Sequence, residues 1–411
     1  SCLTNWFADG STQTVTAVAD EGYTFHGWSG DAAISDNTAA EAVITMTQPK
    51  TLVAIFRSDC HEPATCVWKS SSKTGSWNDP SNWEGGATPG EGDTVILANS
   101  SATLITLDLF TPALASLVVS NRANAATTLL ASNWNTRIRA AEIVVGTNGV
   151  IRCAGGFADG QMSNRVWCAA GAMRIEAGGR IDADAGGYGP ANGPGWVPGA
   201  NNSESSDRGG SHGGRQGADR WVLQSLPPAK VYGSAEAPVA PGSGSYPYNG
   251  GGAVRLEVAG ALAIDGVVTA NSGGSRPTGS GGSVYINCET IRGAGLVSAS
   301  AGRYAYPSTG DFGSSGVSGN AGGGGGRIAV HYDPEAQDAC GCTILFEAKG
   351  TPVATGAARS NLGGGLGTLW FTDARFVASP LRHSGVILVP GFDAWGPDEL
   401  RVDGWVQFPP G

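Results

Sequence analysis

The chain has 411 residues, a formal net charge of −10 at pH 7 and a charged-residue content of 15%, against about 25% in an average globular protein. An acidic chain with only five lysines does not suit binding to nucleic acid or to an anionic membrane surface. A long polyanionic substrate is disfavoured too, unless arginines gather locally. No apolar run reaches the roughly 18 residues of a membrane-spanning helix.

Residues 1–58 form a first unit of predicted β-strands. QTVTAVAD (13–20) alternates apolar and polar residues, and EAVITMTQPKTLVAIFR (41–57) contains two strands joined at 48–50. The pattern GYTFHGWSGD (22–31) with ITMTQPKTLVAIF (44–56) resembles the divergent InlB B-repeat modules of bacterial surface proteins. This resemblance implies a small β-grasp-like spacer in an exported protein. We expect His26 and Trp28 to serve core and turn packing, with a ligand site as the alternative.

A short linker at 59–66, DCHEPATC, leads into a second unit. The motif GSWNDPSNW (75–83), followed by PGEGD (89–93), resembles the openings of β-helical passenger-like regions in exported bacterial proteins. The open end of a β-helix is a sheet edge that must be covered. We therefore expect Trp77 and Trp83 to cap the apolar bore of the first coil, with sugar stacking as the alternative.

Between 93 and 152 the sequence predicts short strands that recur every ten to fifteen residues, separated by Gly, Asn and Ser. The glycine content, 65 residues, is more than twice the usual share of about 7%, which favours a β-helix over a sandwich. The predicted strands are TVIL, ATLITLDL, SLVVS, TTLLAS, EIVVG and GVIRC.

An explicit repeat follows. The element Gly-Gly-small-Val-x-apolar at 251–256 returns thirty residues later at 281–286, and repeats of this length indicate stacked units. We align 170–187 with 251–274 in the same frame, and expect further copies at 325–334 and, weakly, at 365–373. Glycine would serve positive-φ corners and close backbone approach. GGSHGGR (209–215) and GGGGGRIAVHY (322–332) resemble glycine-rich β-helical repeats of large secreted proteins of environmental bacteria.

The sequence thus predicts an all-β protein: a small β-grasp-like module at 1–58, a linker at 59–66, and a right-handed parallel β-helix with long glycine-rich loops at 67–375. The tail, 376–411, would add terminal strands, a last coil or the start of a further unit. The chain reads as a trimmed piece of a longer exported protein.

Cysteine usage favours disulfide bonds in an oxidising compartment over metal binding, because no pair of Cys or His clusters has zinc-site spacing. Cys153 and Cys168 would close a loop of about fifteen residues. The candidates for disulfide bonds, besides Cys2, are Cys60, Cys66, Cys153, Cys168, Cys288, Cys340 and Cys342.

The long excursion at 188–250 is the place where chemistry would lie, because long loops in compact folds are often functional. It combines aromatic residues with titratable ones, as a polysaccharide groove requires. The catalytic candidates are Asp207, His212, Arg215 and Asp219, and the ligand-binding candidates are Trp196, Trp221, Tyr232, Tyr246 and Tyr248. The alternative for His212 is a packed, hydrogen-bonded histidine. Asp182 and Asp184 would share a strand face, or one of them would sit in a turn and bind backbone amides.

Three function classes stay open from the sequence. The first is a non-catalytic extracellular bacterial surface or matrix protein, a β-helical rod for adhesion or assembly. The others are a polysaccharide hydrolase or lyase on a β-helix, and a carbohydrate-binding module. The expected partners are extracellular polysaccharide or copies of the chain. We expect a secreted or cell-surface location, no cofactor and no metal, structural Ca²⁺ being the one alternative.

Overall fold

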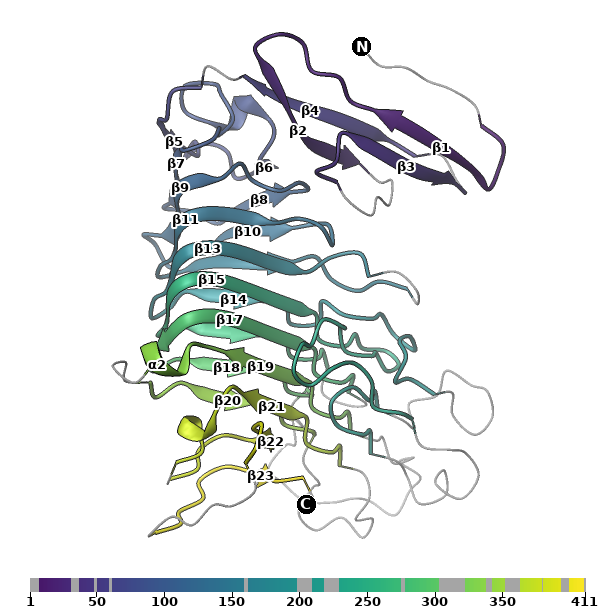
Figure 1. The fold of residues 1–411 in the computed structure, drawn as a ribbon, viewed down its shortest axis with the longest axis vertical. Helices are drawn as coiled ribbons and strands as arrows, with labels where there is room; N and C mark the ends of the chain where they lie inside the picture. The colour runs from purple at the N-terminus through teal and green to yellow at the C-terminus, as the bar shows by residue number, and fades with distance from the viewer. Residues whose placement is uncertain are drawn as a thin grey trace.

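The computed structural model describes residues 7–30, 37–47, 50–58, 61–158, 162–197, 209–217, 229–274, 278–302, 322–337, 342–351, 363–378, 380–392 and 399–409. The fold is all-β, as predicted: a small module of antiparallel strands lies at one end of a parallel β-helix (Figure 1).

The N-terminal module contains two antiparallel pairs. Strand β1 (Ser11–Thr16) pairs with β3 (Glu41–Met46), and β2 (Tyr23–Gly30) pairs with β4 (Leu52–Ser58). The Phe25 ring lies 5.3 Å from that of Trp28 and 5.7 Å from that of Phe56. These aromatic contacts supply the apolar packing that so small a unit otherwise lacks.

The β-helix is built from two long parallel sheets that face each other, with one strand from each in most coils. The first sheet has eight strands: β6 (Thr74–Ser76), β8 (Thr103–Leu107), β10 (Thr127–Ala131), β12 (Gly149–Cys153), β14 (Arg180–Asp182), β16 (Val267–Thr269), β18 (Leu296–Ser298) and β20 (Leu345–Glu347). The second has eleven: β5 (Thr65–Val67), β7 (Thr94–Asn99), β9 (Leu114–Asn121), β11 (Ile138–Val145), β13 (Val166–Ile175), β15 (Ala253–Ile264), β17 (Ser283–Arg292), β19 (Arg327–His331), β21 (Thr368–Phe371), β22 (Gly385–Leu388) and β23 (Val406–Gln407).

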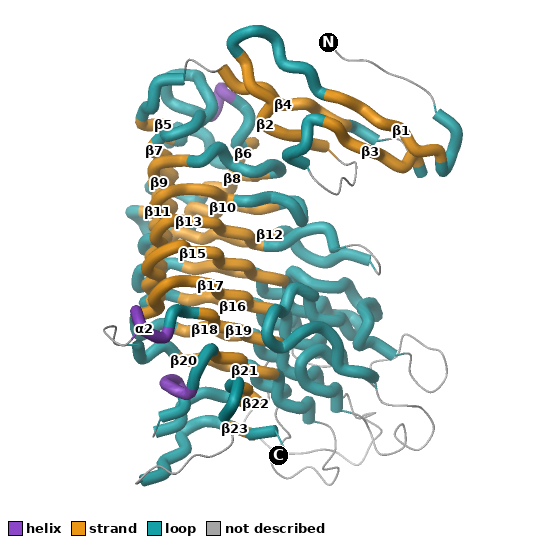
Figure 2. Tube along the Cα trace, viewed as in Figure 1, coloured by secondary structure: helices purple, strands orange, loops and turns teal. Residues whose placement is uncertain are grey.

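The helical elements are short: η1 (Pro80–Asn82), α2 (Pro334–Gln337) and η2 (Ala374–Phe376). Each lies in a connection between two strands (Figure 2, purple).

The bore between the sheets is filled by side chains stacked in register. Ile105 pairs with Leu129, and the same position continues through Ile151 and Ile181 in the coils that follow, all fully buried. Alternate residues of each strand point inward because the side-chain direction has a period of two. The β-helix is therefore one continuous apolar core along its axis.

The thirty-residue repeat matches the coil spacing. Val254 pairs with Val284, and Leu256 with Ile286, as the sequence frame predicted. Residues 170–182 pair with 258–269, within the stretch 251–274 that was aligned with them, and Met173 lies beside Leu262 rather than Val254. The apolar–polar alternation repeats along the longer strand, so sequence similarity fits two registers, and the structure adopts the later one.

Three indoles close the first coil. Trp68, Trp77 and Trp83 are all at most 1% exposed, with the Trp83 ring 5.2 Å from that of Trp68 and 5.0 Å from that of Trp77. The Trp83 Nε1–H donates to the Trp77 carbonyl at 2.8 Å. The capping role expected for Trp77 and Trp83 holds; their burial removes the sugar-stacking alternative.

The glycine-rich segments form a third layer beside the coils, which we call the glycine layer: 186–189, 209–215, 241–245, 249–252, 279–282, 322–326 and 364–367. Successive amides donate to different neighbours: Gly250 to Tyr188, Gly251 to Ser280 and Gly252 to Ala183. Donation in three directions is what an extended, polyproline-II-like chain with three residues per turn provides. The layer is thus hydrogen-bonded by backbone outside any strand (Figure 2).

Close backbone packing explains the glycines of this layer. A Cβ on Gly282 would lie 1.9 Å from the Gly252 carbonyl oxygen, and one on Gly244 would lie 1.9 Å from that of Gly189. None of these four residues has a positive φ. The role predicted for glycine at positive-φ corners therefore does not apply to them, whereas the predicted close approach does.

The parallel ladder continues beyond residue 375. Strand β22 pairs with β21, and β23 pairs with β22. The described part of the tail therefore adds strands to the eleven-stranded sheet.

The N-terminal module contacts the β-helix directly. The His26 ring lies 4.5 Å from the Phe110 ring, and the Arg57 Nη1 donates to the Pro89 carbonyl at 2.5 Å. Burial, together with the positive charges of Arg57 and Arg139, lowers the pKa of His26 to about 3. His26 is thus a neutral packing residue at the junction.

The described cysteines, Cys66, Cys153, Cys168, Cys288 and Cys342, are free thiols, so no disulfide bond joins them, contrary to expectation. Cys153 lies on β12 and Cys168 on β13, in different sheets. Both are buried, and burial raises the pKa of each to about 12. They act as small apolar side chains. Cys2, Cys60 and Cys340 lie outside the described residues.

Candidate functional site

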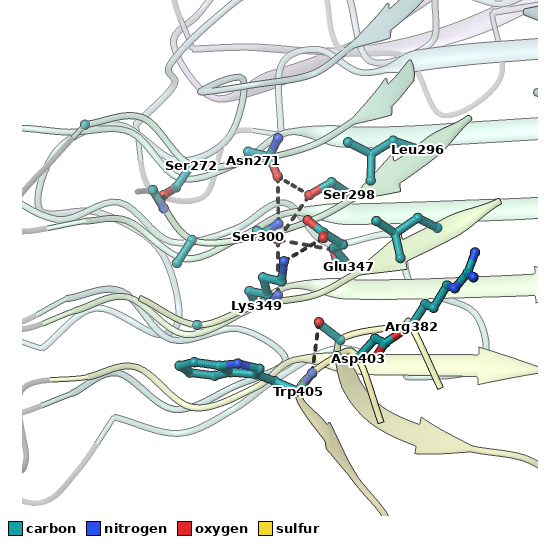
Figure 3. Close-up of a pocket in the computed structure, with 17 residues that line it drawn as sticks. Asn271, Ser272, Leu296, Ser298, Ser300, Glu347, Lys349, Arg382, Asp403 and Trp405 are labelled. Atoms are coloured by element: carbon teal, nitrogen blue, oxygen red, sulfur yellow. Dashed lines mark hydrogen bonds and ion pairs between the residues drawn. The ribbon is translucent and has the colours of Figure 1, made fainter. Parts of the chain in front are cut away.

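A cleft of about 890 Å³ lies at the carboxyl ends of strands β16, β18 and β20, a size within the usual range of ligand sites. Figure 3 shows its polar side chains, which come from successive coils and from the segment before β23. Its lining includes Asn271, Ser272, Leu296, Ser298, Ser300, Leu345, Glu347, Lys349, Arg382, Ser384, Asp403 and Trp405.

Parallel register explains why these side chains meet. Thr269 of β16, Ser298 of β18 and Glu347 of β20 occupy the same position in neighbouring strands. Residues two positions later share the face, because side chains alternate along extended backbone. Polar residues at these alternate positions therefore form adjacent rows along the flank of the rod.

The floor of the cleft is a connected hydrogen-bond network. The Asn271 Oδ1 accepts from the Ser298 Oγ at 2.7 Å and from the Ser300 amide at 2.8 Å. The Lys349 amide donates to the Ser300 Oγ at 3.1 Å, and the Lys349 Nζ donates to the Glu347 Oε1 at 2.6 Å. This network fixes the side chains before any ligand arrives.

Trp405 forms the rim of the cleft (Figure 3). Trp405 is 59% exposed, but its backbone is held in place. Its amide donates to the Ser384 Oγ at 3.2 Å, and its carbonyl accepts from the Gly385 amide at 2.9 Å. An indole held at an open cleft offers a flat apolar face to a ligand.

Asp184 continues the polar row one coil above the cleft. Its Oδ1 accepts from the Asn271 amide at 2.7 Å, while the Asp182 Oδ1 accepts from the Asp184 amide at 2.9 Å. Arg180 pairs with both carboxylates. Burial raises the pKa of Asp184, although the Asn271 amide and Arg180 oppose this. The alternative in which these aspartates bind backbone amides is the one the structure adopts.

The structure describes two of the four predicted catalytic residues, His212 and Arg215. His212 is 0% exposed, its Nδ1 lies 2.9 Å from the Gly281 carbonyl oxygen, and burial lowers its pKa to about 3, helped by the charge of Arg327. It matches the packed-histidine alternative. Arg215 is exposed, and its carbonyl accepts from Gly365 within the glycine layer. Asp207 and Asp219 lie outside the described residues.

Four of the five predicted aromatic ligand-binding residues lie in the described ranges. The Tyr232 hydroxyl donates to the Pro241 carbonyl at 2.6 Å, and its ring lies 4.7 Å from that of His212, so Tyr232 packs the glycine layer. Trp196 and Tyr248 are half-buried, and Tyr246 is 46% exposed. None of these four lines the cleft. Trp221 lies outside the described residues.

Sequence reasoning missed the cleft because its residues are spread from 271 to 405. The signal available was the recurrence of polar residues at alternate positions after each short strand: TAN at 269–271, SAS at 298–300 and EAK at 347–349.

Among the described residues, no group of three or more His, Cys, Asp and Glu side chains is placed to hold a metal ion. No helix in the described ranges is long and apolar enough to cross a membrane.

Comparison with known proteins gives one assignment, to the N-terminal module. No curated protein and no solved structure matches the chain. Residues 4–60 match the family model of the divergent InlB B-repeat domain. The predicted resemblance of this module is confirmed, and the presence of such a domain indicates a surface-associated protein.

Proposed function

We propose that this protein is a non-catalytic extracellular surface protein whose β-helical rod presents a polysaccharide-binding cleft at Trp405. The observation that carries the proposal is an exposed, backbone-anchored indole beside a fixed floor of hydroxyl, amide and ionic groups. Sugars offer apolar C–H faces and hydroxyl edges, so they match a site that combines an aromatic face with convergent polar groups.

The floor retains hydrogen-bonding capacity for such a ligand. Asn271 uses its Oδ1 within the network, and its Nδ2 has no acceptor among the described residues, so it is free to donate to a sugar hydroxyl. The Ser272 hydroxyl accepts from the Gly302 amide at 2.6 Å and can still donate. Leu296 and Leu345 provide the apolar part of the lining.

The carboxylates of the cleft support binding rather than hydrolysis. Glu347 pairs with Lys349 at 2.6 Å, and Asp403 pairs with Arg401 at 3.0 Å. Glycoside hydrolysis uses two carboxyl groups that flank the scissile bond, one of them as a proton donor. Carboxylates engaged with cations are suited to accepting hydrogen bonds from sugar hydroxyls.

The test is binding of neutral polysaccharides to the full chain, with Trp405→Ala and Trp405→Phe compared against Leu400→Ala. Leu400 is 56% exposed and does not line the cleft, so it is a matched control. We expect Trp405→Ala to weaken binding about tenfold, as loss of an interface anchor does, with Trp405→Phe intermediate. Unchanged affinity in Trp405→Ala would contradict the proposal.

The same preparations distinguish binding from catalysis. Release of reducing ends or of unsaturated products from a bound polysaccharide would overturn the non-catalytic assignment, whereas tight binding without products supports it.

A further inference from the structure

A second cluster of side chains lies on the outer face of the eleven-stranded sheet, away from the cleft. Three arginines surround the indole of Trp167: the guanidinium carbon of Arg165 lies 4.2 Å from the indole centroid, that of Arg137 4.7 Å and that of Arg255 5.7 Å. We call this the arginine–tryptophan cluster. Arginine stacked on an indole is held in place while the edge of its guanidinium stays available.

One carboxylate serves this cluster among the described residues. The Glu257 Oε1 accepts from the Arg255 Nη2 at 2.6 Å, and its Oε2 accepts from the Trp167 Nε1 at 2.7 Å and lies 3.5 Å from the Arg137 Nη2. Burial would raise the pKa of Glu257, but the hydrogen bonds from Arg255 and Trp167 lower it. Glu257 is therefore ionised, and three guanidinium groups against this one carboxylate leave a formal charge of +2.

Arg165 is the least compensated of the three arginines. Its Nε donates to the Trp134 carbonyl at 2.8 Å, and its guanidinium also lies over the Trp134 ring at 4.6 Å. Its two terminal nitrogens have no acceptor within the described ranges. Burial and the nearby charge of Arg255 lower the pKa of Arg165 to about 10. The cluster is thus short of negative charge, in a chain whose formal net charge is −10.

The cluster continues as a row that crosses the coils. Arg255 also lies over the Tyr285 ring at 4.8 Å, the Tyr285 ring is 5.2 Å from that of His331, and His331 stacks on Trp370 at 4.2 Å. Because these residues lie on neighbouring strands of one sheet, with about 4.8 Å between strands, the row runs along the axis of the rod. A ligand that uses it is extended rather than compact.

We propose that the arginine–tryptophan cluster binds an acidic polysaccharide, with a uronate carboxylate on the free edge of Arg165. A planar guanidinium can bind a carboxylate through two parallel hydrogen bonds. The local positive charge also offsets the repulsion that an acidic chain would otherwise exert on a polyanionic ligand. The site lies on strands of the eleven-stranded sheet that do not line the Trp405 cleft, and it does not depend on the cleft.

The experiment measures binding of the full chain to polygalacturonate, with dextran as the neutral polymer and dextran sulfate as the sulfated one. We expect Arg165→Ala to weaken polygalacturonate binding about tenfold, and Arg165→Lys, which keeps the charge but loses the fork, to give an intermediate loss. Arg174→Ala is the matched control, because Arg174 lies on β13, the strand that directly follows Arg165, is 50% exposed and pairs with Glu142 at 3.1 Å away from the cluster. Binding should weaken as salt increases.

Thermal unfolding of each variant checks that the fold is retained. Arg137→Ala provides a second test, at a position whose side chain is 40% exposed. Wild-type affinity in both Arg165→Ala and Arg137→Ala would overturn the proposal, as would a loss of dextran binding in Arg165→Ala as large as its loss of polygalacturonate binding. Binding to dextran sulfate alone would overturn the carboxylate assignment. Trp405→Ala should keep polygalacturonate binding, so failure at the cleft is distinguishable from failure at the cluster.

Discussion

The bore of the β-helix and the glycine layer beside it bury backbone in opposite ways. In the bore, strands are separated from the facing sheet by stacked side chains such as Ile151 and Ile181, which exclude water by their own volume. In the glycine layer, the Gly282 backbone lies directly against that of Gly252, and amides reach three different neighbours. The bore is therefore specified by the side chains that are present, and the glycine layer by the absence of side chains.

The largest effect is expected from emptying the bore. Phe346 is fully buried, with its ring 5.2 Å from that of Phe371 and 5.5 Å from that of Phe376. Phe346→Ala should lower the free energy of unfolding by about 3–5 kcal/mol, measured by denaturant unfolding. Leu345→Ala, the neighbouring residue on β20 that faces the cleft, is the control and should cost less; equal losses would show that the bore does not dominate stability.

A slightly smaller effect is expected from adding a single methyl group to the glycine layer. Gly282→Ala would place a Cβ 1.9 Å from a carbonyl oxygen that belongs to backbone and cannot rotate away, so we expect a loss of about 3 kcal/mol. Gly155→Ala is the control, since its Cβ would meet nothing nearer than 3.5 Å. If both alanine variants unfold like the wild type, close backbone packing does not hold the layer together.

The smallest effect is expected in the pH dependence of the free energy of unfolding, to which each region contributes one buried histidine. Burial lowers the pKa of His212, in the glycine layer, to about 3, and that of His383, against the ring of Phe346, to about 4, from an ordinary value of 6.5. Below pH 6.5 these histidines bind protons in the unfolded chain but not in the folded chain. Their contribution to stability is therefore fully present above pH 6.5 and is lost as the pH falls toward their folded-state pKa values.

Replacing either histidine by asparagine should therefore reduce the slope of unfolding free energy between pH 6 and 4, by up to about 1.4 kcal/mol per pH unit. His331→Asn, at a half-buried ring, is the control. A slope that stays the same in both His212→Asn and His383→Asn would rule out buried neutral histidines as the source of acid sensitivity.

The coils could be predicted from the sequence because their signal is local and periodic. Val254 and Val284 occupy equivalent places in a thirty-residue repeat, and their strands pair in that register. The glycine layer and the cleft could not be predicted in the same way. The Gly324 amide donates to the Gly210 carbonyl, and Trp405 lies beside Ser384 and the ends of β18 and β20. These contacts join segments that are far apart in sequence. Which segments meet depends on how many coils separate them, and no short sequence pattern contains that information.

His212 shows what the sequence could not reveal about the glycine layer. A histidine among glycines has the composition of a flexible active-site loop, and only the closeness of Gly281 and Tyr232 shows that it is enclosed. The arginine–tryptophan cluster is a similar case, because Arg165 and Arg255 are separated by the whole excursion and meet only through the pairing of β13 with β15.

The glycine layer also determines how this protein exchanges its amide hydrogens. The N–H groups of Gly250, Gly251 and Gly252 donate inward and are shielded from water, although this segment is neither helix nor strand. Slow exchange, usually taken as a mark of sheet or helix, should therefore extend into segments that far-ultraviolet spectroscopy counts as irregular. Order in this molecule exceeds its content of regular secondary structure.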